Sequence, residues 1–222
     1  MLDAIAQALP PHYSPIRDAE SDLAVGPYGY IMAINFLNRG VFSLVFVYSL
    51  TRTLRRTEAV PGSGAGSKNR YSSGLRLLDV WGVGAILLAI FPTDVPATPV
   101  SWHGAIHLVV ATIAFLAGAL GALRLSSQFG QSQALRGVRG AAMALAVLAA
   151  IFCVLTLGLG FVSPHLAAQI GGLNERIFLA MVLLWMATVS IYLLRYNPPI
   201  GAEGSSGRKD HPPASPLAPV DK

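Results

Sequence analysis

Five long apolar stretches run through this chain of 222 residues, and each is long enough to cross a lipid bilayer as a helix. They cover about residues 29–51, 75–91, 103–123, 140–162 and 177–194. A helix satisfies its backbone hydrogen bonds internally, whereas an open sheet leaves edge groups unsatisfied in lipid. Charged residues make up only 12% of the chain, about half of the share that is usual in soluble proteins. The sequence therefore predicts an all-α, polytopic transmembrane helix bundle with five spans.

The distribution of lysine and arginine predicts the orientation of this bundle. These residues gather after the first and third stretches and at the start of the tail, and short basic loops stay on the cytoplasmic side. We therefore expect residues 1–28 outside the cytoplasm, together with the connections that contain Asp94 and His165. Residues 195–222 are expected to form a disordered cytoplasmic tail, because they are rich in proline, glycine and serine. The net charge of +5 then reflects topology and not nucleic-acid binding, and we expect an integral protein of the bacterial inner membrane.

Two polar residues in the first stretch, Asn35 and Arg39, lie four positions apart and therefore share one helical face. A guanidinium inside the membrane needs a carboxylate or several carbonyl groups around it. The carboxylates considered as partners are Asp79, Asp94 and Glu175, and we favour Glu175. An ion pair that fixes helix packing is favoured over a role in transport or catalysis.

A second polar group surrounds the start of the third stretch. His103 and His107 are four residues apart, so both imidazoles project from one side of a helix, as two metal ligands would need to. With Asp94 and His165 they would form a zinc site at the outer surface. The same residues also suit a purely structural role, because histidines at helix starts bond carbonyl groups and Ser101 can cap the helix. Both interpretations stay open at this point.

Four short motifs are spread along the chain: residues 21–30, Phe-Pro-Thr-Asp at 91–94, Gly-Ala-Ile-His at 104–107, and Glu-Arg-Ile at 175–177 with Trp185 after it. Over about residues 22–195 the chain resembles the uncharacterised multi-pass membrane proteins grouped as domain of unknown function 998. The resemblance implies that the motif positions are occupied by Asp94, His107, Glu175 and Arg176. His103 does not lie on such a position. The resemblance implies an architecture and no assigned activity.

Three functions are compatible with these residues. A more distant resemblance to the alkaline ceramidases, which hold zinc with three histidines beside a serine and an aspartate, implies a metal-dependent hydrolase acting on lipid; the helix count and the motif spacing differ. Small residues such as Gly82, Gly118 and Gly158 permit close helix approach and favour an accessory or structural subunit of a membrane complex. A carrier of small solutes or ions is the third alternative, because Arg39 could attract an anion.

We expect the accessory or structural role. The sequence names no catalytic residue. It predicts a polar cluster near the outer face, made of Asn35, Arg39, Asp94, His107, Glu175 and Arg176.

Overall fold

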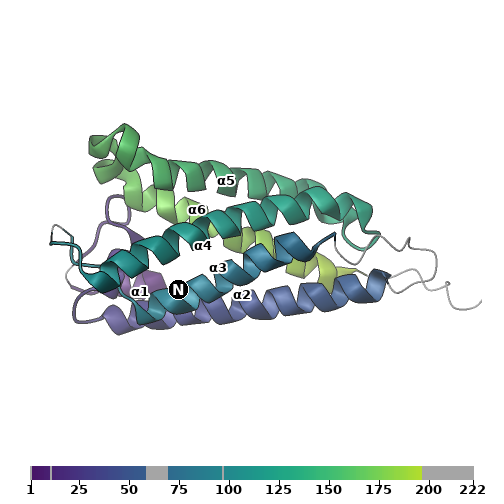
Figure 1. Ribbon diagram of the computed structural model, residues 1–222, viewed down its shortest axis with the longest axis horizontal. Coiled ribbons are helices and arrows are strands. Elements are labelled where there is room, and N and C mark those ends of the chain that lie inside the picture. Colours follow the sequence, from purple (N-terminus) through teal and green to yellow (C-terminus); the bar gives the residue numbers. More distant parts are fainter. Residues whose placement is uncertain (1, 11, 59–69, 97, 197–222) are drawn as a thin grey trace, which may run out of the picture.

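The computed structural model describes residues 2–10, 12–58, 70–96 and 98–196, and within these ranges the chain is helical and contains no strand. Residues 197–222, most of the expected tail, lie outside the described residues. Five long helices lie side by side along one axis (Figure 1). They are α2 (Gly29–Glu58), α3 (Ser72–Ile90), α4 (Trp102–Gln128), α5 (Arg139–Val162) and α6 (Pro164–Arg195). All five are long and apolar enough to cross a membrane, so the predicted five-span bundle is confirmed.

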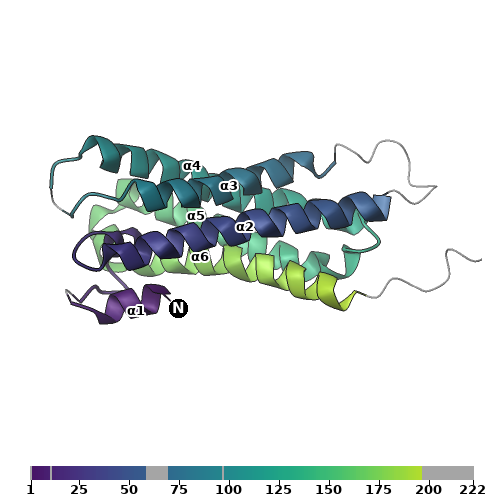
Figure 2. The same ribbon diagram turned by 90° about the horizontal axis from the view of Figure 1, so that it is seen from below.

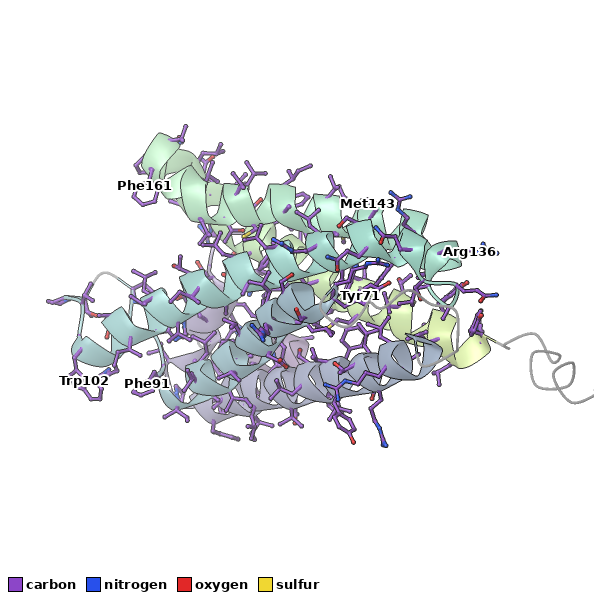
Figure 3. The ribbon with its side chains drawn as sticks, turned by 45° about the vertical axis from the view of Figure 1, so that its right-hand side comes forward. Tyr71, Phe91, Trp102, Arg136, Met143 and Phe161 are labelled. Carbon is purple, nitrogen blue, oxygen red and sulfur yellow. The ribbon has the colours of Figure 1, made fainter. Side chains whose placement is uncertain are left out.

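Successive long helices run in opposite directions, so the connections alternate between two ends of the bundle. The α3–α4 connection, which contains Asp94, lies at the same end as the start of α6, and we call this the Asp94 end. The α4–α5 connection lies at the opposite end, which we call the Arg136 end; Figure 3 labels Phe91, Trp102 and Phe161 at the former and Arg136 at the latter. The side of the membrane that each end occupies remains a prediction.

The interior of the bundle combines aromatic packing with a few buried hydrogen bonds. Trp81 and Trp185 are both almost fully buried. The indole nitrogen of Trp81 donates to Ser43 Oγ at 3.1 Å, and that of Trp185 donates to Ser126 Oγ at 2.8 Å. A buried indole N–H needs such a partner, because neither lipid nor a packed core supplies an acceptor. Each bond joins two helices, α2 to α3 and α4 to α6.

The start of α6 differs from its prediction. The apolar stretch begins near residue 177, but the helix begins at Pro164. Ser163 caps it by accepting a hydrogen bond from the backbone amide of Leu166 at 3.3 Å, and proline suits the first helical position because it has no amide to satisfy. Apolar length alone did not reveal the added turns, since polar residues such as His165 and Gln169 occur in them.

The segment before α2 folds onto the Asp94 end. It contains α1 (Leu2–Ala8) and the short 3-10 helix η1 (Glu20–Ala24). Ala6 of α1 is buried in one cluster with Leu23, Met32 and Phe36. Figure 2 shows α1 at this end of the bundle, beside α2 and α6. The segment therefore places side chains of η1 against the spanning helices.

Candidate functional site

The carboxylate that pairs with Arg39 comes from η1. Arg39 Nη2 donates to Glu20 Oε1 at 2.5 Å, and Asn35 Nδ2 donates to the same oxygen at 3.2 Å. The side chains of Arg39 and Glu20 are only 10% and 4% exposed. Side chains of a helix tilt toward its N-terminus, so Arg39 projects toward the Asp94 end, where η1 lies. Glu175 was the expected partner, and that expectation is wrong.

Glu20 is not among the carboxylates that the sequence analysis considers for Arg39. A signal was present: Arg39 needed a carboxylate, and three acids, Asp18, Glu20 and Asp22, precede the first span closely. Only the path of the segment between them and α2 decides which acid reaches Arg39. That path depends on tertiary contacts with α6.

Glu175 and Arg176 make those contacts. Glu175 Oε2 accepts a hydrogen bond from the backbone amide of Glu20 at 3.2 Å. Arg176 Nη1 donates to three carbonyl oxygens, those of Pro15 at 3.1 Å, Asp18 at 2.7 Å and Gly172 at 3.1 Å. The approach is so close that a Cβ on Gly172 would overlap the carbonyl group of Asp18. The predicted cluster members on α6 therefore hold the N-terminal segment in place.

Asp94 organises the connection between α3 and α4. Its Oδ2 accepts from the Ser101 amide at 2.9 Å and its Oδ1 accepts from Ser101 Oγ at 2.5 Å. These two bonds lower the pKa of Asp94 below its ordinary value, because they favour the charged carboxylate. Ser101 Oγ also accepts from the Gly104 amide at 3.1 Å and lies 2.8 Å from His103 Nδ1. Ser101 thus caps α4, as the structural interpretation required.

The histidines occupy separate environments. His107 is buried, with Nδ1 2.7 Å from the Phe91 carbonyl oxygen. His165 is exposed at the start of α6, with Nε2 3.4 Å from Gln169 Nε2. In the described ranges no group of three or more His, Cys, Asp or Glu side chains is placed to hold a metal ion. The four residues considered for zinc, Asp94, His103, His107 and His165, are therefore not brought together as a ligand set.

A cavity of about 630 Å³ lies between α2 and α6, and we call it the α2–α6 groove. Figure 2 shows these two helices side by side. Near the Asp94 end its walls are polar, with Asp3, Glu20, Asn35, Asn38, Arg39 and Arg176. Farther along α2 and α6 they are mostly apolar, with Phe42, Phe46, Leu179, Leu183 and Met186. Phe42 is 71% exposed and Leu183 is 41% exposed, so the groove opens on the flank of the bundle.

Several polar atoms of the residues that line this groove lack partners. In the described part of the chain, Glu20 Oε2 and Arg176 Nε and Nη2 are buried without a hydrogen bond. An unsatisfied buried polar atom costs about 1–3 kcal/mol. Arg39 also borders a second cavity of about 200 Å³, which His107 and Glu175 line as well. Arg39 therefore lines both cavities.

Comparison with known proteins adds the family. No curated protein and no solved structure matches the chain. The motifs singled out above all fall within one family match, which agrees with the resemblance they carried. The chain belongs to the family described as Protein of unknown function (DUF998), whose model matches residues 1–192.

Proposed function

We propose that this integral membrane protein binds an amphiphilic molecule in the α2–α6 groove. The observation that carries the proposal is the division of one groove into a charged, hydrogen-bonding end and an apolar remainder. Its volume of about 630 Å³ falls within the range of about 300–1,000 Å³ that is typical of small-molecule sites. A molecule with a polar head and an apolar tail fits both parts at once.

The depth of the polar end also suits a lipid head group. Arg39 precedes Arg52, which lies toward the Arg136 end, by 13 residues, or about 20 Å along a helix. The hydrocarbon core is about 30 Å thick, so Arg39 lies about 10 Å from the opposite boundary if Arg52 marks the first one. Its side chain tilts toward that nearer boundary. The polar end of the groove then lies just below the head groups, and the apolar part lies among the acyl chains.

The packing of the small residues gives weaker support to an accessory-subunit role. A Cβ on Gly82, Gly84, Gly118 or Gly121 would come within 3.0 Å of a neighbouring helix of the same chain. These glycines are therefore used inside the bundle. Gly158 and Gly160 have nothing within 4 Å of such a Cβ. These two positions of α5 therefore leave room for the close approach of a partner protein. The accessory role stays a prediction with this narrower basis.

The hydrolase and carrier alternatives also stay predictions. For the hydrolase, Ser101 Oγ is already engaged by Asp94, the Gly104 amide and His103, and this arrangement supports a helix cap more than a nucleophile. For the carrier, Arg39 between two cavities is the supporting feature. Binding of an amphiphile is better supported than either alternative, because the groove offers a polar end for the head group and an apolar part for the tail.

A bulky residue in the apolar part of the groove tests the proposal. Ala187 is exposed and lines the groove, so Ala187→Trp should fill the space where the tail would lie. Ala144 is an exposed alanine on α5 that does not line the groove, so Ala144→Trp is the matched control. Native mass spectrometry of the full chain, purified in mild detergent, measures the amphiphile that each variant retains.

We expect the wild-type chain and Ala144→Trp to retain the same amphiphile at similar occupancy, and Ala187→Trp to lose most of it. Equal retention by both tryptophan variants would place the bound molecule elsewhere and overturn the proposal. A wild-type chain that retains nothing, even after incubation with membrane lipid extract, would overturn it as well.

A further inference from the structure

We infer that the second cavity binds a cluster of water molecules, which His107, Glu175 and Arg39 hold inside the bundle. All three residues line this space of about 200 Å³, and we call it the His107 cavity. It is a different space from the α2–α6 groove, so the inference goes beyond the proposed function and does not depend on it. Polar atoms that lack protein partners, but are not fully enclosed, carry the inference.

His107 offers an acceptor to this cavity. The side chain is 4% exposed, and its Nδ1 lies 2.7 Å from the carbonyl oxygen of Phe91. A carbonyl oxygen only accepts, so Nδ1 carries a proton, and in the neutral imidazole Nε2 is then an acceptor. Nε2 has no hydrogen-bond partner among the described residues and is not fully enclosed. A donor that enters the cavity can therefore reach it.

Glu175 and Arg39 add a second acceptor and several donors. Glu175 is 9% exposed; its Oε2 accepts from the Glu20 amide, whereas its Oε1 has no partner in the described structure. Arg39 uses Nη2 for Glu20, and its Nε and Nη1 make no hydrogen bond to the described residues. None of these unpartnered atoms is fully enclosed. The cavity therefore presents both acceptors and donors to a guest.

Charge and size together favour water as this guest. Arg39 and Glu175 line the cavity with opposite charges, so an anion would meet the carboxylate and a cation would meet the guanidinium. A neutral molecule that both donates and accepts hydrogen bonds satisfies the two groups at once. A volume of about 200 Å³ holds about six water molecules at roughly 30 Å³ each. Internal water persists where it finds about two to four polar partners, as it does here.

The other walls of the cavity show where water enters and where it stops. Ser21 of η1 and Thr93 of the α3–α4 connection line the cavity as well. Both residues lie outside the long helices at the Asp94 end, so water has a route from that end. Phe36 and Phe115 supply apolar walls. The water therefore has its hydrogen-bonding partners on the polar side of the cavity.

Hydroxyl-radical footprinting of the full chain in mild detergent tests the inference. An X-ray pulse makes radicals from water, these oxidise side chains that lie next to water, internal water included, and mass spectrometry locates the products. Phe36 and Phe115 are buried and line the His107 cavity, whereas Phe129 and Phe178 are buried and do not line it. We expect oxidation of the first pair and none above background for the second.

A larger side chain in the cavity supplies a matched comparison. Ala111 lines the cavity, so Ala111→Leu should displace water from it. Ala105 is an exposed alanine on the same helix that does not line the cavity, so Ala105→Leu is the control. We expect Ala111→Leu to lose the oxidation of Phe36 and Phe115, and Ala105→Leu to keep it at the wild-type level.

Nuclear magnetic resonance of isotope-labelled histidine nitrogens tests the His107 wall directly, with His107→Gln to assign the signal. We expect a neutral ring with its proton on Nδ1 and a bare, hydrogen-bonded Nε2. A neutral ring with its proton on Nε2 would contradict the inference.

Two footprinting results would also overturn the inference. If Phe36 and Phe115 of the wild-type chain are as unreactive as Phe129 and Phe178, the cavity holds no water. If Ala111→Leu leaves their oxidation unchanged, the water lies elsewhere. Neither result touches the proposed function, because retention of an amphiphile by Ala187→Trp is measured separately.

Discussion

Arg39 is buried in the bundle, and its positive charge needs a counter-ion there. A buried guanidinium without a counter-ion is strongly unfavourable, and Glu20 is the one acid that forms an ion pair with it among the described residues. The two belong to different elements, so their pairing also fixes η1 against α2. A side chain that the ligand would touch therefore also stabilises the fold around it.

A double-mutant cycle measures this coupling. Glu20→Gln alone leaves the Arg39 charge buried without a counter-ion, and we expect it to lower the free energy of unfolding by about 3–5 kcal/mol. Arg39→Gln should cost a similar amount for the converse reason. The double variant should cost less than the sum by at least about 1 kcal/mol, because no unpaired charge then remains. Strictly additive losses, measured by denaturant unfolding in micelles, would contradict the pairing.

The packing of the long helices requires that neighbouring helices approach one another closely. A Cβ at Gly40 of α2 would lie 2.6 Å from the carbonyl oxygen of Gly82 on α3. Backbone atoms cannot move aside as a flexible side chain can, so α2 and α3 would have to separate. Small residues at helix contacts serve this purpose in membrane proteins generally. Here they join helices of one chain.

The matched pair Gly40→Ala and Gly158→Ala tests that requirement. Gly40→Ala should destabilise the bundle by about 1–3 kcal/mol through overpacking. Gly158→Ala should be neutral or stabilising by up to about 1 kcal/mol, since the site is open and alanine is the better helix former. The comparison uses the same unfolding assay in micelles. Equal effects of the two substitutions would show that the α2–α3 contact is looser than the structure indicates.

The helices themselves were largely predictable, because a membrane span can be recognised from the length of its apolar stretch. The start of α6 was not, since its first turns include polar residues and are stabilised by the Ser163 cap and by contacts with the N-terminal segment. The partner of Arg39 was missed for a related reason. Which acid reaches Arg39 depends on how residues 15–18 dock against Arg176. That docking uses backbone carbonyl groups, which every residue has, so the sequence does not reveal it.

In the whole molecule, successive connections alternate between the two ends of the bundle, as the positions of the basic residues predict. The proposed binding site uses one side of this bundle, the α2–α6 groove. In the structure the residues of the predicted polar cluster take part in three separate groups: a cap around Asp94, a bond from His107 to Phe91 and a charged group around Glu20. Only the last of these borders the α2–α6 groove. The groove was not predictable, because its walls come from the spacing of two helices that are distant in sequence.

Photolabelling with a phospholipid that carries a diazirine in its acyl chain tests the central claim most directly. In dilute detergent only retained lipid is labelled, and peptide mapping then reports where its tail lies. We predict adducts on Phe42 and Phe46 of α2 and on residues 179–187 of α6, with little label on the exposed residues Val80 of α3 and Val154 of α5. Label spread evenly over all five helices, or concentrated on α3 and α5, would contradict the account.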